Sequence, residues 1–223
     1  MQPSNVRHFY PTLEPVLQSW FASRDLHNWK PPATPEQLHA AERILGRPIP
    51  GMLGAIYEMT NGLSLLQGNL QLGELGGDAI LSFPSASDEL RKRGWLLPSE
   101  AHVFAGDGAD NLFGLWLDET DNDSPPVVEI GSIFEHGCMT VAGTTLDRFL
   151  RRWTAYYLLV CEAPASALDA LRLPSHLRVS EVDDALVIKL CAWADPELPR
   201  VAPDPYRDRL TPDDVRQLFS SRK

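Results

Sequence analysis

The sequence has few cysteines and no long apolar run. Its three cysteines, Cys138, Cys161 and Cys191, are odd in number and widely spaced, so they form neither a zinc-binding pattern nor a disulfide framework. No apolar stretch approaches the roughly twenty residues that a membrane-spanning helix requires. Glu14 and Gln18 interrupt the N-terminal region where a secretory signal would have its apolar core. We therefore expect a reduced, cytoplasmic protein that does not enter a membrane.

The short motifs of common enzyme classes are also missing. There is no Gly-x-Ser-x-Gly nucleophile elbow, no glycine-rich phosphate loop ending in Gly-Lys, and no His-Glu-x-x-His metal helix. The histidines are spread along the chain without ligand spacing: His8, His27, His39, His102, His136 and His176. We therefore predict no cofactor, no metal and no enzymatic activity. An enzyme of unknown chemistry stays open as an alternative, because a fold can unite Ser, His and Asp from distant positions.

Negative charge, in contrast, is plentiful in one segment. The chain has a net charge of −10, and residues 74–135 hold thirteen Asp and Glu against three Lys and Arg, while the remainder holds seventeen of each sign. This imbalance disfavours nucleic-acid binding, which uses clustered basic side chains. It is compatible with a basic protein partner, because complementary potentials accelerate encounter.

The acidic loops of this segment allow three interpretations. Asp118, Asp121 and Asp123 lack the spacing of an EF-hand calcium loop. Asp107 and Asp110 belong to a glycine-containing turn that offers oxygen ligands but is also typical of a plain connection. These residues are therefore solvated turn residues, a surface that binds a partner, or metal ligands. We single out six of them as a partner-binding acidic surface: Asp107, Asp110, Asp118, Glu119, Asp121 and Asp123.

The best-signalled secondary structure lies between Thr34 and Gly62. Thr34 and Gln37 have the spacing of a helix capping box, and Gly46 supplies the left-handed residue that commonly closes a helix. Pro50 is predicted to open a second helix, which ends at Asn61 and Gly62. An earlier amphipathic helix is expected over residues 10–23.

The remaining pattern predicts an α+β fold. Short strands are grouped between helices rather than alternating with them, which favours a mainly antiparallel sheet of about five to six strands with helices packed on it. Strands are expected over residues 63–66, 70–72, 102–105, 112–117, 126–130 and 139–142, and residues 79–83 are a further candidate for a short strand. Ser87 is predicted to cap a helix that reaches residue 95, and Thr144, with Asp147, to cap a long one.

The C-terminal part is expected to be a helical appendage. Pro164 begins a nearly charge-balanced region with helix-start signals at residues 180–183 and 211–214. We predict an α+β domain over residues 1–163, including the N-terminal helix, and a helical extension over residues 164–223 that packs on it.

Several segments together resemble the SUKH superfamily (Smi/Knr-like). Its opening is similar to the pattern Glu42…Leu45-Gly46…Ile49-Pro50…Ile56-Tyr57…Asn61-Gly62, and its middle strand and turn are similar to residues 103–110. Residues 126–128 and 144–153 resemble its late strand and closing helix. The likeness covers residues 34–157, and its motifs are short and mostly structural.

The resemblance implies a SUKH-like fold and a binding function. That superfamily contains fungal cell-wall regulators and many bacterial immunity proteins. We expect a non-catalytic module that binds and occludes a cognate protein toxin, with a regulatory scaffold of the cell-wall-regulator type as the alternative. The family motif specifies neither the toxin nor the contact residues, and the oligomeric state is not predicted.

Overall fold

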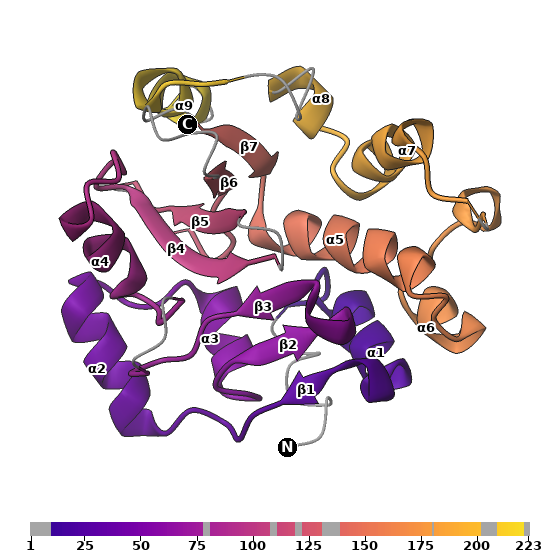
Figure 1. Cartoon of the computed structure of the whole chain (residues 1–223), viewed down its shortest axis with the longest axis horizontal. Helices are drawn as coiled ribbons and strands as arrows, with labels where there is room; N and C mark the ends of the chain where they lie inside the picture. The colour runs from indigo at the N-terminus through magenta and orange to yellow at the C-terminus, as the bar shows by residue number, and fades with distance from the viewer. Residues whose placement is uncertain are drawn as a thin grey trace.

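The computed structural model describes residues 10–77, 81–107, 111–118, 122–130, 139–179, 181–201 and 209–220. These residues form an α+β fold around one open antiparallel sheet, in which the seven described strands follow one another in chain order from β1 to β7 (Figure 1). The predicted fold class is therefore confirmed.

The strands are short and the longest helix is α5. The strands are β1 (Asn28–Trp29), β2 (Leu63–Leu65), β3 (Leu70–Leu72), β4 (Ala101–Gly106), β5 (Leu112–Trp116), β6 (Val127–Ile130) and β7 (Thr140–Gly143). The α-helices are α1 (Glu14–Ala22), α2 (Pro35–Leu45), α3 (Gly51–Tyr57), α4 (Ala86–Lys92), α5 (Leu146–Val160), α6 (Ala165–Ala170), α7 (Asp184–Ala194), α8 (Leu198–Val201) and α9 (Pro212–Ser220). The 3-10 turns within the described residues are η2 (Arg24–Leu26), η3 (Leu66–Gly68) and η5 (Ser175–Leu177).

The local signals at Thr34, Gly46 and Pro50 are satisfied as predicted, whereas α3 ends at Tyr57 and not at Asn61 and Gly62. The hydroxyl of Thr34 accepts from the backbone N–H of Gln37 at 3.3 Å, and the Gln37 side chain accepts in return from the N–H of Thr34 at 2.9 Å. Gly46 adopts a left-handed conformation with φ of 72° at the end of α2. Pro50 precedes the first residue of α3. These contacts lie within a few residues of each other, so the sequence alone determines them.

The sheet is covered on both faces. On one face Phe104, Phe113 and Val127 join the main core, to which α1, α3 and α5 contribute their apolar residues. On the other face Val128 and Trp116 belong to a second cluster, together with residues of α4, α8 and α9. Successive side chains of a strand point to opposite faces, so Val127 and Val128 belong to different clusters.

The sheet has more strands than the five to six expected. The additional edge strand is β1, where Asn28 pairs with Ser64 and Trp29 with Leu63. Its two residues carry no alternating pattern of their own, and pairing with β2 defines them as a strand. The strand expected over residues 79–83 lies partly outside the described residues, and Phe83 forms an isolated parallel bridge with Leu75.

Two predicted helix caps are wrong. Ser87 lies inside α4, and its hydroxyl accepts from the N–H of Val103 at 2.7 Å instead of capping the helix. Thr144 precedes the N-cap of α5, and its backbone N–H and hydroxyl donate to the Asp195 carboxylate at 2.6 and 2.7 Å. Both side chains bond to partners far away in sequence, which capping rules do not consider.

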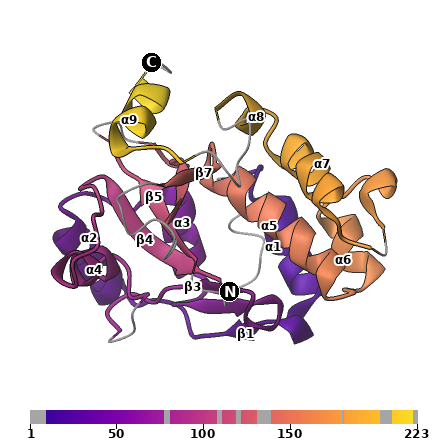
Figure 2. The same ribbon diagram turned by 45° about the horizontal axis from the view of Figure 1, so that its top comes forward.

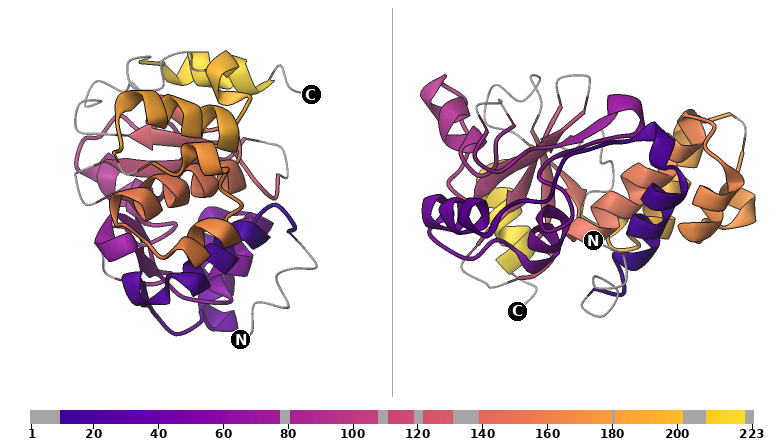
Figure 3. Two further views of the ribbon diagram at one scale, coloured as in Figure 1. Left: turned by 90° about the vertical axis from the view of Figure 1, so that its right-hand side faces the viewer. Right: turned by 90° about the horizontal axis from the view of Figure 1, so that it is seen from below.

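Two of the C-terminal helices, α6 and α7, pack against α5, and α6 also packs against α1. Figure 2 shows α7 outside α5, and Figure 3, seen from below, shows α6 beside α1. The last helix, α9, covers the end of the sheet formed by β6 and β7, where Val215 and Phe219 enter the second cluster (Figure 1). Leu210, just before α9, pairs with Met139 in an isolated antiparallel bridge.

Candidate functional site

Two of the acidic residues singled out from the sequence lie at opposite ends of one strand. Asp107 directly follows β4, and Asp118 comes two residues after β5. Because β4 and β5 are antiparallel, these residues are separated by at least the length of the five-residue strand β5, roughly 17 Å at about 3.3 Å per residue. Asp110, Glu119 and Asp121 lie outside the described residues. The structure therefore does not bring Asp107 and Asp118 together.

Asp107 closes the turn between β4 and β5. Its carboxylate accepts from the backbone N–H of Asn111 at 3.0 Å and from the Asn111 side chain at 2.8 Å. Its own N–H donates to the carbonyl of Asn111 at 3.0 Å. The residue is half-buried and has a structural role in the turn.

Asp118 and Asp123 lie at the other end of β5, beside α2 and α3. The Arg47 guanidinium donates to the carbonyl of Asp118, and the N–H of Met52 donates to the carbonyl of Asp123 at 3.1 Å. The Asp123 side chain is exposed. Burial and the nearby Asp123 carboxylate raise the pKa of Tyr10. These contacts bring two of the predicted acidic residues to the same end of the sheet.

Part of the acidic excess is neutralised by bases from elsewhere in the chain. Lys30 forms an ion pair with Glu74 at 2.9 Å, and Arg216 from α9 forms one with Glu100. The hydrogen bond from Arg216 lowers the pKa of Glu100 to about 2. The charge excess counted along residues 74–135 is therefore larger than the excess that these residues present in the folded protein.

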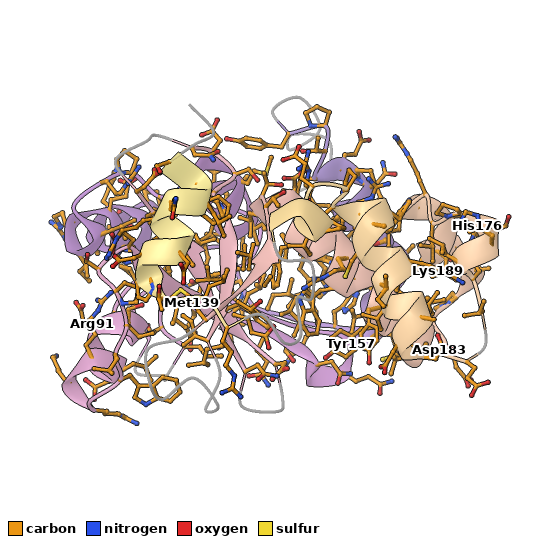
Figure 4. The ribbon with its side chains drawn as sticks, turned by 90° about the horizontal axis from the view of Figure 1, so that it is seen from above. Arg91, Met139, Tyr157, His176, Asp183 and Lys189 are labelled. Carbon is orange, nitrogen blue, oxygen red and sulfur yellow. The ribbon has the colours of Figure 1, made fainter. Side chains whose placement is uncertain are left out.

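A pocket lies between the last two strands and helices α5 and α7. Its volume is about 220 Å³. Pockets for drug-sized ligands measure roughly 300–1,000 Å³, so this one suits a smaller molecule. Its lining combines charged, aromatic and aliphatic side chains: Asn111, Glu129, Val141, Ala142, Arg152, Trp153, Tyr156, Tyr157, Val187 and Leu190. Tyr157 and the α7 N-cap Asp183, both labelled in Figure 4, lie on this side of the molecule, away from Met139.

Glu129 provides a carboxyl group at the sheet side of the pocket. It stands opposite Phe113 on β5 and Thr140 on β7, so it shares the face that packs against α5. Burial raises the pKa of Glu129 to about 7; the Asp107 carboxylate adds to the rise and the Arg152 guanidinium opposes it. A carboxyl group of this kind changes charge near neutral pH, which is typical of functional sites.

Arg152 provides a guanidinium group from α5. The side chain is 8% exposed, and its Nη1 donates to Sγ of Cys191 on α7 at 3.4 Å. In the described part of the chain, no carboxylate lies within ion-pair distance of Arg152. Its positive charge nevertheless opposes the rise in the pKa of Glu129. A half-buried carboxyl group and a buried guanidinium group thus line one pocket without direct contact.

Three aromatic side chains of α5 form one wall. The rings of Trp153 and Tyr157 are stacked, with centroids 5.1 Å apart, and Tyr156 meets Tyr157 edge-on at 4.8 Å. The indole N–H of Trp153 is buried and, in the described part of the chain, has no hydrogen-bond partner. Burial and the Asp107 carboxylate raise the pKa of Tyr157. The wall therefore combines flat aromatic surface with an indole N–H that has no partner among the described residues.

The sequence alone does not reveal this pocket. Glu129 lies within a predicted strand, and Arg152 lies beside the apolar stripe of the predicted long helix. The signal that was available is the alternation of the strand, which places Glu129 on the same face as the buried Val127. A charged residue on the buried face of a strand needs a compensating partner or a ligand.

A comparison with protein-family models now identifies the family. The model of the SMI1/KNR4 family (SUKH-1) matches residues 32–152, just over half of the chain. The chain belongs to the SMI1/KNR4 family. This confirms the predicted resemblance. No significant match was found among curated proteins.

The SMI1/KNR4 match covers only part of the pocket lining. It begins before α2 and ends at Arg152, so Asn111, Glu129 and Arg152 fall inside it. Trp153, both tyrosines and the residues of α7 fall outside. The pocket is therefore built jointly by the matched domain and by the region that follows it.

Two further features of this family member bear on function. Within the described ranges, no group of three or more His, Cys, Asp and Glu side chains is placed to hold a metal ion. Among the helices of the described residues, none has both the length and the apolar character needed to cross a bilayer.

Proposed function

We propose that this chain is a non-catalytic protein-binding module of the immunity type. It binds, in the cytoplasm, a cognate bacterial toxin whose surface is basic, and it neutralises the toxin by covering it. The observation that carries the proposal is membership in the SMI1/KNR4 family, since the superfamily it resembles includes many bacterial immunity proteins. Binding without chemistry requires only a complementary surface.

The proposed contact surface is the end of the sheet that follows β5. Asp118 and the exposed Asp123 lie there, and Glu119 and Asp121 lie between them in sequence. A cluster of negative charge steers a basic partner toward this end of the molecule. Asp107, at the far end of β5, is a second and separate acidic position, and Asp110 follows it three residues later in the sequence.

A tight complex also needs apolar anchors, because peripheral charges mainly affect the rate of association. Ile44 on α2 is 60% exposed. It lies three residues before Arg47, whose guanidinium contacts Asp118. We take this exposed apolar side chain of α2 as the candidate anchor beside the acidic surface.

Co-expression with the toxic product of the neighbouring gene tests the proposal. The wild-type chain should restore growth and form a stoichiometric complex with the toxin. Ile44→Asp should abolish rescue, because it places a charge where the complex buries an apolar anchor. Ile188→Asp is the matched control: Ile188 is 62% exposed but lies on α7, on the opposite side of the molecule (Figure 1).

Failure of the wild-type chain both to restore growth and to bind the toxin would contradict the immunity function. A stable complex with a cellular protein, without rescue, would instead favour a regulatory scaffold. Rescue by the Ile44 variant equal to that by wild type would keep the function and exclude this surface.

A further inference from the structure

We propose that the pocket between α5, α7 and the last two strands binds a small zwitterion, an α-amino acid with an apolar side chain. The ammonium group of the ligand pairs with Glu129, and its carboxylate pairs with Arg152. This site is additional to toxin binding and does not depend on it.

The first argument is the charge of the lining. Glu129 on β6 and Arg152 on α5 both line the pocket, and no described residue forms an ion pair with either of them. An isolated buried charge is costly until an opposite charge and hydrogen bonds compensate it. A cation alone would leave Arg152 uncompensated, and an anion alone would leave Glu129 uncompensated. A ligand that carries both charges compensates both.

The second argument is hydrogen-bonding capacity. The indole N–H of Trp153 is buried without a described partner, although it belongs to the pocket wall. Arg152 has one Nη atom on Cys191 Sγ, a weak acceptor, and its guanidinium carries five N–H donors in all. A ligand carboxylate is the strong acceptor that this side of the pocket lacks, because charge-assisted bonds from Arg to a carboxylate are frequently bidentate.

The third argument is the shape and polarity of the remaining walls. Val187 and Leu190 of α7 and Val141 of β7 line the pocket together with the rings of Trp153 and Tyr157. These residues give an aliphatic or aromatic ligand side chain apolar contacts. The volume of about 220 Å³ limits the ligand to the size of a single amino acid.

The ionisation of Glu129 agrees with this assignment. The groups that face it are Arg152 and Tyr157 from α5 and Asp107 from the β4–β5 turn. Burial and Asp107 keep Glu129 partly protonated near neutral pH in the free protein. An ammonium group stabilises the ionised form, so ligand binding should release a proton from Glu129 near pH 7.

Calorimetric titration of the full chain tests the inference. L-leucine is the probe. Isopentylamine is the matched analogue without the carboxylate, and 4-methylpentanoate is the matched analogue without the ammonium group. We expect leucine to bind at millimolar concentration or below, and each analogue to bind at least about tenfold more weakly, because each loses one charge-assisted contact. Valine, methionine and phenylalanine extend the series of side chains.

Variants and spectroscopy separate binding from folding. Glu129→Gln keeps the shape of the side chain and should weaken leucine binding about tenfold or more, with a far smaller effect on 4-methylpentanoate. In the wild-type chain the indole ¹H–¹⁵N signal of Trp153, assigned with Trp153→Phe, should move on addition of leucine. Because the binding measurement is made on the wild-type chain, it does not depend on whether a variant folds.

Three results would overturn the inference. The first is no binding of any apolar amino acid at millimolar concentration. The second is equally tight binding of leucine and isopentylamine, which would make the pocket a cation site. The third is leucine binding that leaves the Trp153 signal in place. None of them would affect toxin neutralisation, which is measured separately.

Discussion

At the scale of single residues, Glu129 links stability to pH. Its pKa is raised to about 7 in the folded protein, against 4.5 for an unperturbed glutamate, because folding buries the carboxyl group. Between these two pH values the folded state holds a proton that the unfolded state has lost. The stabilising effect of that proton is complete below about pH 4.5, and it is lost as the pH rises through about 7.

We therefore predict that wild-type stability falls across this window by up to about 3 kcal/mol, at about 1.4 kcal/mol per unit of pKa shift. Glu129→Gln should remove this contribution to the decline and be more stable than wild type at about pH 8. Urea unfolding at a series of pH values measures it. Glu58→Gln, at an exposed position of the same residue type, is the control and should follow the wild-type profile. A Glu129 variant with an unchanged slope would contradict the prediction.

At the scale of elements, Asp195 joins the end of α7 to the start of α5. It is 1% exposed and receives two hydrogen bonds from Thr144, and Arg148 lies 3.5 Å from its carboxylate. The residue also ends α7, as its C-cap. This buried carboxylate therefore holds the end of α7 against the start of α5.

Asp195→Ala should lower the free energy of unfolding by about 2–4 kcal/mol, because it leaves the buried N–H and hydroxyl of Thr144 without acceptors. Asp183→Ala is the comparison. Asp183 caps α7 at its exposed start, so its loss should cost only about 1 kcal/mol. Urea unfolding followed by circular dichroism gives both values. Equal losses in the two variants would show that the Asp195 contacts contribute no more than a surface cap.

The elements also show which features a sequence can predict. The capping box of Thr34 and the left-handed Gly46 depend on neighbours along the chain, and both are found as predicted. Thr144 has the spacing of a cap, yet it bonds to Asp195, fifty-one residues away. Ser87 likewise bonds to Val103. Local patterns determine helices and turns, whereas the partner of a buried polar side chain depends on the tertiary fold.

The same reasoning explains the outcome for the candidate site. An acidic excess along the sequence is visible at once, but Lys30 and Arg216 neutralise part of it from distant positions. The pocket combines Glu129 of β6 with Arg152 of α5 and with residues of α7. No spacing rule relates these three segments, so only their packing reveals the pocket.

At the scale of the whole molecule, the uneven distribution of charge predicts how a partner approaches. Replacing Asp118, Glu119, Asp121 and Asp123 by their amides should slow association with a basic toxin, because it removes the negative charge that steers the partner. The association rate of the wild type should fall as salt is added, because screening acts over about 8 Å at physiological ionic strength. Dissociation should change less.

The matched control for this experiment lies on α4. Asp88 and Glu89 belong to the same acidic segment but form ion pairs with Arg91 and Arg93 of their own helix. Amide substitutions at these two positions should leave the association rate close to that of the wild type. Stopped-flow mixing across a salt series measures all three proteins. Equal rates for the four-site variant and the wild type would rule out electrostatic steering by this surface.

The order of the strands has a consequence for how the chain folds. Each strand from β2 onward pairs with the strand made just before it, so the sheet can grow as the ribosome releases the chain. The apolar face of α1 is covered later, because its partners come late in the chain. The indole N–H of Trp20 donates to the hydroxyl of Thr154 on α5, and α1 packs beside α6. During synthesis this face of α1 stays without these partners until α5 and α6 have emerged. A chaperone that shields apolar surface would therefore meet this protein at its N-terminal helix first.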